Sequence, residues 1–131
     1  MRVPFALLAA VRGLAGWAWL LALAPALTGA DADLPAVRRI EVMAHRYAFE
    51  PAVIEVTKGE TVEIVAHSTD TEHGLAIKAL GVKLVIPKGG ATVSATFVAR
   101  QAGRFPIECS EYCGSGHKRM KGELIVTEAG R

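Results

Sequence analysis

The residues with the clearest capacity for chemistry lie in one short stretch, CSEYCGSGHKRM, which runs from Cys109 to Met120. This stretch holds two thiols, one imidazole and one thioether within twelve residues. Thiolate and thioether groups are soft ligands, and in combination with imidazole they favour copper. An isolated upstream histidine, His73, stands where one strand-like run ends and another begins. We therefore predict a copper site that two segments of the chain assemble, and electron transfer as its chemistry.

The second cysteine decides between two kinds of copper site. A mononuclear blue-copper site uses two histidines, one cysteine and a long axial methionine. Here both Cys109 and Cys113 are present, and cysteine binds metal as the thiolate. Two thiolates can bridge two metal ions, and each ion can then complete its shell with one histidine. The set of donors thus fits a binuclear centre better than a mononuclear one.

Plainer explanations exist for each of these residues. In an exported chain, Cys109 and Cys113 can form a structural disulfide. His73 alone is typical of a loop histidine, and Met120 alone is typical of a core side chain. The joint presence of these residues, with Asp70 three positions before His73, favours metal ligation. The disulfide stays open as the alternative state of the two cysteines.

Other polar residues receive simpler interpretations. His45 and His67 have no potential ligands near them in the sequence, and we expect ordinary surface or strand-end positions for both. Lys118, Arg119 and Lys121 form a basic flank beside the candidate site. We expect a solvated face there, with partner docking as the alternative because charge complementarity steers association.

The elements that must position these residues are short strands. Apolar and polar residues alternate with the period of half-buried strands, and glycine or proline residues separate the runs. Seven or eight strands at this spacing predict an antiparallel β-sandwich, in which the cysteine-rich stretch connects the last two strands and Gly114 and Gly116 let it turn sharply. The predicted strands cover residues 37–44, 53–56, 61–66, 75–79, 82–86, 91–99, 104–107 and 123–127.

The N-terminal residues differ in composition from the rest. Arg2 and Arg12 precede an uncharged stretch at 13–30 that ends in small residues, the pattern of a secretory signal peptide. A retained membrane anchor is the alternative, because the stretch approaches the length that crosses about 30 Å of hydrocarbon. We predict a signal peptide or single anchor at 1–32 and one domain at 33–131. The formal net charge of the chain is +2, and no basic run indicates a nucleic-acid partner.

At these motifs the chain resembles the copper-A domain of cytochrome c oxidase subunit II, a cupredoxin, and the short subunit II of ba3-type oxidases in particular. The resemblance covers residues 47–127, including STDTEHG around His73 and CSEYCGSGHKRM. It implies an all-β, Greek-key cupredoxin-like sandwich and a centre of two copper ions. It also implies that Cys109 and Cys113 bridge both ions, while His73 and His117 bind one each.

The same resemblance implies two weaker ligands and a cellular setting. Met120 is expected on the copper that His73 holds, and Glu111 on the other copper through its main-chain carbonyl. The expected partners are a redox donor, either a cytochrome c or another cupredoxin, and an oxidase subunit I. The expected location is the periplasm or the outer face of a bacterial cytoplasmic membrane, with membrane association through the N-terminal segment.

One departure from the family concerns aromatic residues. Many relatives use a tryptophan for electron entry, whereas both tryptophans here fall in the N-terminal segment, at positions 17 and 19. Tyr47 and Phe49 occupy roughly the corresponding region, which leaves the docking of a cytochrome c open.

Two functions follow from these patterns. The first is an electron-transfer protein with a binuclear copper-A centre, either the donor subunit or a stand-alone relative of a cytochrome c oxidase. The alternative is a periplasmic copper carrier that uses the same soft ligands for delivery. The sequence has no nucleophile–base pair, phosphate loop or zinc-hydrolase spacing. We therefore expect no catalysis by the chain alone.

Overall fold

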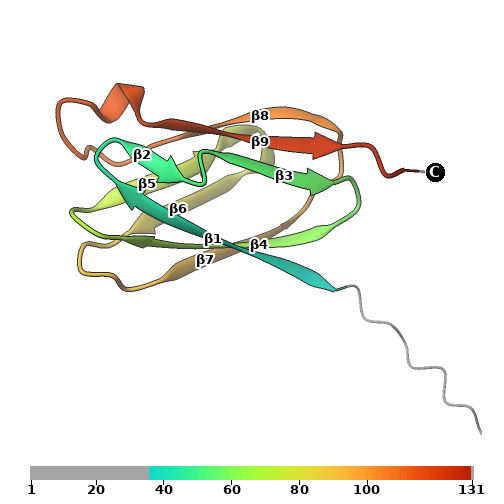
Figure 1. The fold of residues 1–131 in the computed structure, drawn as a ribbon, viewed down its shortest axis with the longest axis horizontal. Helices are drawn as coiled ribbons and strands as arrows, with labels where there is room; N and C mark the ends of the chain where they lie inside the picture. The colour runs from blue at the N-terminus through green and yellow to red at the C-terminus, as the bar shows by residue number, and fades with distance from the viewer. Residues whose placement is uncertain (1–35, 131) are drawn as a thin grey trace, which may run out of the picture. The chain divides into compact units, whose positions relative to one another are not determined.

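The structure is a computed structural model that describes residues 36–130 (Figure 1). Within that range the chain forms strands with two short 3-10 helices, Lys78–Leu80 and His117–Arg119. None of the helices in this range is long and apolar enough to cross a membrane. The predicted signal or anchor segment lies outside the described residues. The strands are β1 (Val37–His45), β2 (Ala48–Glu50), β3 (Val53–Thr57), β4 (Thr61–Ser68), β5 (His73–Ile77), β6 (Val82–Ile86), β7 (Val93–Val98), β8 (Gly103–Glu108) and β9 (Lys121–Thr127).

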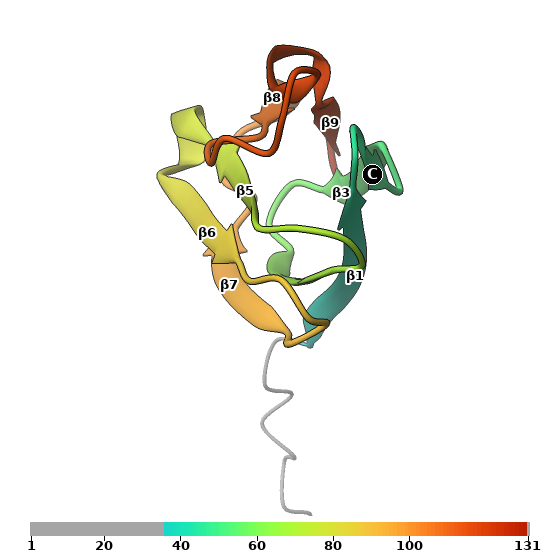
Figure 2. The ribbon, with the colours of Figure 1, turned by 90° about the vertical axis from the view of Figure 1, so that its left-hand side faces the viewer.

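The strands form two sheets that pack face to face, as Figure 2 shows end-on. One sheet has four strands in the order β2-β1-β4-β7, and the other has five in the order β3-β9-β8-β5-β6. The chain changes sheet between β2 and β3, β3 and β4, β4 and β5, β6 and β7, and β7 and β8. The predicted all-β sandwich is confirmed.

The prediction of a purely antiparallel sandwich is wrong in two places. Strand β1 pairs with β4 in parallel, and β3 pairs with β9 in parallel. Parallel neighbours require a connection that crosses over instead of a tight hairpin. Here β2 and β3 form the connection from β1 to β4, and β3 lies in the opposite sheet. Alternation in the sequence reports which face of a strand is buried, but not the direction of its neighbour.

Two elements differ from their predicted bounds for local reasons. Strand β2 was not predicted because three residues are too few to show a period; it is held by its pairing with β1, in which Ala44 faces Phe49. The strand predicted at 75–79 is shifted toward the N-terminus. It begins at His73 and ends at Ile77, and the next three residues form the first 3-10 helix. Gly81 ends that helix with a φ of 67°, a conformation that favours glycine.

The buried faces of both sheets meet in one apolar core. Alternate residues of β4 and β9 point inward, among them Ile64 and Leu124, which are fully buried. Burial of one such side chain contributes about 1.5–3 kcal/mol relative to exposure. Every residue of β5 is buried, including His73 at its start. The core thus reaches the end of the sandwich where the predicted site residues lie.

Candidate metal centre

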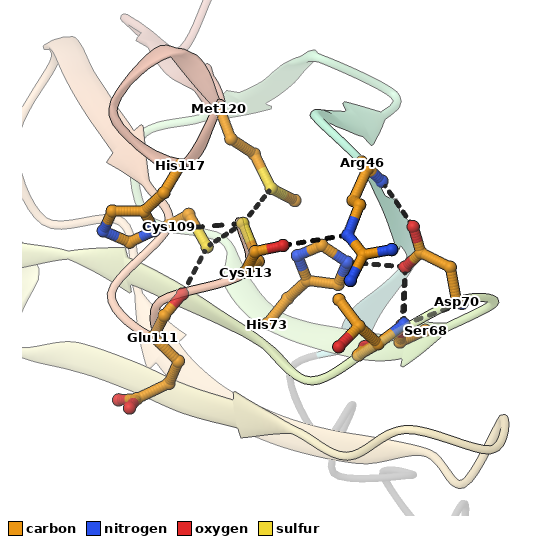
Figure 3. Close-up of polar contacts among 10 residues, drawn as sticks. Arg46, Ser68, Asp70, His73, Cys109, Glu111, Cys113, His117 and Met120 are labelled. Atoms are coloured by element: carbon orange, nitrogen blue, oxygen red, sulfur yellow. Dashed lines mark hydrogen bonds and ion pairs between the residues drawn. The ribbon is translucent and has the colours of Figure 1, made fainter. Parts of the chain in front are cut away.

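The stretch from Cys109 to Met120, named here the ligand loop, leaves β8 and returns into β9 at the left-hand end of Figure 1. Its two ends are joined, because the Cys109 amide donates a hydrogen bond of 3.2 Å to the carbonyl of Met120. Inside the loop the sulfur atoms converge (Figure 3). The Sγ atom of Cys113 lies 3.7 Å from the Sγ of Cys109 and 3.8 Å from the Sδ of Met120. All three side chains are buried.

The sulfur–sulfur distance bears on the disulfide alternative. A disulfide bond is about 2.05 Å long, whereas these two Sγ atoms are 3.7 Å apart. Both cysteines are free thiols in the structure. Burial, and then the neighbouring Cys109, raises the pKa of the Cys113 thiol to about 11. A bound cation must therefore displace the proton for the thiolate to form, so that metal uptake releases protons.

His73 completes the cluster from the opposite segment. Three donor atoms lie within 4.8 Å of one another: one nitrogen of the His73 imidazole, the Cys109 Sγ and the Cys113 Sγ. The Nε2 atom of His73 is 2.7 Å from the Asp70 carboxylate, while the Nδ1 atom is buried without a hydrogen-bond partner. A buried polar atom left unpaired costs about 1–3 kcal/mol. A metal ion at Nδ1 removes this cost, so the residues fit a metal.

His117 and Glu111 approach the same sulfur atoms from the solvent side. The Nδ1 atom of His117 is 3.9 Å from the Cys113 Sγ, and the imidazole is half-buried. The Cys109 thiol donates a hydrogen bond of 3.1 Å to the carbonyl oxygen of Glu111. The carboxylate of Glu111 forms an ion pair with Lys83 at 3.3 Å instead. The structure thus brings all six sequence-predicted residues together, and their roles as ligands stay a prediction.

Asp70 holds His73 in this orientation. Burial alone would raise the pKa of Asp70, but hydrogen bonds from His73 and from the main-chain amides of Arg46 and Thr71 outweigh burial and lower the pKa to about 2. A carboxylate on the far nitrogen of a metal-binding imidazole selects the tautomer and fixes the ring. Asp70 therefore leaves Nδ1 of His73 available to a metal.

Arg46, which the sequence did not single out, connects the two ligand segments. Its main-chain amide donates a 2.8 Å hydrogen bond to Asp70. Its side-chain Nε donates a 2.9 Å hydrogen bond to the carbonyl of Cys113 in the ligand loop (Figure 3). Arg46 stands in the turn between β1 and β2, in the motif HRYAFEP. In the sequence, Arg46 is distinguished only by its position next to the aromatic residue Tyr47.

Glycines allow the close packing of the ligand loop. A Cβ atom on Gly74 would lie 2.7 Å from the amide nitrogen of Glu111, so strand β5 could not approach the loop with any larger residue. Gly114 has a φ of 131°, as the predicted sharp turn requires. At Gly116 the backbone does not require glycine, because its φ is −91°, a value that other residues adopt. A Cβ atom at Gly116 would instead overlap the ring of Tyr47.

The remaining residues of interest lie apart from the sulfur cluster. Phe49 is buried in the apolar core, so that only Tyr47 of the two expected aromatics reaches the ligand loop. His45 is the last residue of β1 and its Nε2 is 2.8 Å from Glu50, a contact that raises the pKa of His45. His67 lies half-buried in β4.

Replacement of Asp70 by asparagine should change the pH dependence of stability. Because the folded state holds the pKa of Asp70 at about 2, below its ordinary value of 3.8, the ionised carboxylate stabilises the fold above about pH 4 and loses this effect as the pH falls toward about 2. Asp70→Asn should lower the free energy of unfolding of the metal-free protein by about 2 kcal/mol near neutral pH. The loss should shrink steadily in acid.

Urea unfolding over a pH series measures this difference. Glu72→Gln, two positions away and exposed, serves as the control and should leave the curve near that of the wild type. A difference between Asp70→Asn and wild type that stayed constant from neutral pH into acid would contradict the assigned role.

Replacement of Arg46 by methionine should loosen the ligand loop. Methionine keeps an unbranched apolar side chain but removes the donor to the Cys113 carbonyl, and the main-chain bond to Asp70 remains. Loss of one such hydrogen bond costs about 1 kcal/mol. We expect weaker metal binding and an altered charge-transfer spectrum of the loaded protein, measured by competitive titration and absorption. Arg46→Lys should restore part of both, and a spectrum unchanged in Arg46→Met would argue against this contact.

The chain is similar to known proteins in both sequence and fold. A model of the cupredoxin-like domain matches residues 13–126. Two curated proteins called cytochrome c oxidase subunit 2, both from Thermus thermophilus, are each 32% identical to the chain over 90 residues. These matches cover 68% of this chain, but only 65% and 52% of the two relatives. The chain thus matches less than two thirds of the length of either relative.

A solved structure agrees in fold. The periplasmic domain of subunit II of the cytochrome oxidase of Bradyrhizobium japonicum superposes with a TM-score of 0.63 at 20% sequence identity, over 70% of this chain and 84% of that one. The family model spans most of the sequence, including both ligand segments. The two-sheet sandwich and the matched sequence lead to the same conclusion: the chain belongs to the cupredoxin-like domain family.

Proposed function

We propose that the chain is an electron-transfer protein that holds a binuclear copper centre of the copper-A type. The observation that carries this proposal is the sulfur pair, with Cys109 and Cys113 3.7 Å apart and imidazole nitrogens nearby from two different segments. One thiolate would be enough for a mononuclear cupredoxin site. The second thiolate, beside the first in the same buried cluster, would let the two cysteines hold two ions together.

Each donor has a distinct role in this proposal. Cys109 and Cys113 would hold both ions, and His73 and His117 would each bind one. His73 uses Nδ1, because Asp70 occupies its other nitrogen. Met120 supplies a weak thioether ligand. Glu111 supplies its main-chain carbonyl oxygen, which already accepts a hydrogen bond from the Cys109 thiol. When bound, the copper pair would accept and return one electron.

The protein contributes rigidity to this chemistry. The ligand loop is closed at its base by Cys109 and Met120, held from the side by Arg46, and packed against Gly74. Hydrogen bonds and packing that fix the ligands independently of the metal keep their positions similar in both oxidation states. Electron transfer is fast when the ligands move little between the two oxidation states. These contacts favour such small movements, because they hold the ligands in place without the metal.

The cellular setting is part of the proposal. The curated relatives are named as subunit 2 of a cytochrome c oxidase, and one similar structure is described as a periplasmic domain of such a subunit. By this likeness we assign the chain to the periplasm or to the outer face of the membrane. Its donor would be a cytochrome c or a cupredoxin, and its acceptor an oxidase subunit I.

Copper delivery is the second candidate function. It is favoured by a cavity of about 490 Å³ whose wall includes Cys109, His117 and Met120. Three donors that border one open cavity offer an incoming or leaving copper ion a path. A carrier would hold one exchangeable Cu(I) ion, whereas the proposed electron-transfer centre holds two ions that resist chelators.

Copper number separates the binuclear from the mononuclear assignment. The reconstituted wild type should hold two coppers per chain, with an EPR spectrum of one electron shared by two nuclei. Cys113→Ser should hold one copper with a mononuclear spectrum, because a lone thiolate cannot bridge symmetrically. Elemental analysis and EPR make the measurement, with Ser110→Ala in the same loop as control. Two coppers and an unchanged spectrum in Cys113→Ser would sink the binuclear proposal.

The weak and strong ligands should respond differently to substitution. Met120→Leu should retain copper and raise the reduction potential, because the thioether is a weak donor that stabilises the oxidised form. His117→Ala should lose affinity and delocalisation, because it removes a strong ligand and admits water. Voltammetry and copper titration of both variants make the test. Equal damage from the two substitutions would contradict these roles.

A further inference from the structure

The cavity beside the ligand loop has a charged wall that the metal site itself does not require. Its volume is about 490 Å³, and it reaches inward to Cys109 and His117. Three lysines border it: Lys78 after strand β5, Lys118 beside the half-buried imidazole, and Lys121 at the start of β9. These cations come from separate elements, and the fold gathers them around one opening.

The charge around this opening is positive on balance. Glu108 is the acidic residue of the cavity wall, and Lys78 contacts it at 2.6 Å. Lys118 and Lys121 are exposed, and Arg119 between them is exposed as well. We define Lys78, Lys118, Arg119 and Lys121 as the basic rim.

An exposed aromatic residue lies close to His117. Tyr112 is 79% exposed, and the centre of its ring is 5.8 Å from the centre of the His117 imidazole. Exposed tyrosine is enriched in protein interfaces, where the ring supplies apolar contact area at low entropic cost. The half-buried imidazole of the site thus has both an exposed aromatic ring and exposed cations near it.

From these features we propose that the face around His117 docks a redox protein whose own contact surface is acidic. The proposal rests on the proposed electron-transfer function and names the partner class of that site. Carboxylates of the partner meet the basic rim, and its apolar centre contacts Tyr112. One electron leaves the reduced centre of the partner and is taken up at the site beside His117. The partner is oxidised and the site reduced by one electron, without formation or cleavage of a bond.

The arrangement of charges favours this partner over a basic one. Opposite charges across an interface accelerate encounter, and like charges oppose it. The acidic residue of the ligand loop, Glu111, is already paired with Lys83 at 3.3 Å. A basic partner would therefore have to bring its cations against the exposed cations Lys118, Arg119 and Lys121.

The test compares two reduced single-haem cytochromes c of similar potential, one acidic and one basic, as electron donors to the copper-loaded full chain. Stopped-flow absorption over a series of salt concentrations gives the rate constants. The acidic cytochrome should react faster at low salt, and added salt should slow it. The double variant Lys118→Glu/Lys121→Glu should lower its rate at low salt about tenfold or more.

A matched control has the same change in net charge at the opposite end of the sandwich. Lys58 lies there, because its main-chain amide donates a hydrogen bond to the carbonyl of Thr127 at the end of β9. Arg100 lies there too, because it follows Ala99, whose carbonyl accepts a hydrogen bond from the amide of Gly59. Lys58→Glu/Arg100→Glu should leave the rate near the wild-type value. Lys118→Gln/Lys121→Gln provides a milder change of the rim. Copper content and spectrum show that each variant keeps its site.

A second measurement does not depend on copper. Hexacyanochromate(III), a paramagnetic anion, should broaden the amide NMR signals of residues 118–121 and of Tyr112 in the metal-free chain, and hexaamminechromium(III) should not. Broadening at these positions by the anion alone supports the proposal, and equal broadening by both complexes would contradict it.

Three results would overturn the docking proposal while the proposed function stands. The basic cytochrome could reduce the site faster than the acidic one, or the rim and control variants could lose the same share of the rate constant. The third result is a salt-sensitive self-association of the chain that the rim variant abolishes. A wild-type centre that neither cytochrome reduces would overturn both.

Discussion

The Asp70 carboxylate is the interaction on which the arrangement of the site depends. It accepts hydrogen bonds from the His73 ring and from the main-chain amide of Arg46. Through Arg46 it is connected to the Cys113 carbonyl. Three segments far apart in the sequence are thereby aligned before any metal binds. A metal-binding imidazole needs one nitrogen free and the ring fixed, and Asp70 provides both conditions for His73.

The sequence indicates which residues belong to the candidate site more directly than it indicates how the strands around them pair. Cys109, Cys113, His117 and Met120 fall within one short loop, so their convergence depends on local spacing that can be read directly. His73 comes from a different segment, and its pairing with the loop is not visible in local spacing. Arg46 was missed because its contact with Cys113 spans 67 positions. Its side chain has no pattern that distinguishes it from any exposed arginine.

The errors in the fold have related causes. Alternation correctly located most strands because burial of one face leaves a period of two. It did not reveal that β1 and β4 run in parallel, because direction depends on which sheet the intervening strands join. It did not reveal β2, which is too short to have a period. Gly116 was assigned to the right loop for the wrong reason, because the bulk of the Tyr47 ring, not backbone torsion, excludes a side chain there.

The placement of β9 has a consequence for how the protein acquires its metal. Strand β9 lies inside its sheet, between β3 and β8, and it follows directly on the Met120 end of the ligand loop. Of the described strands it is also the one that synthesis completes last. Until β9 is inserted, the two cysteines and His117 lie on an open segment with no return anchor. The full donor set is therefore assembled only when β9 takes its place, because Met120 and the hydrogen bond that closes the loop depend on it.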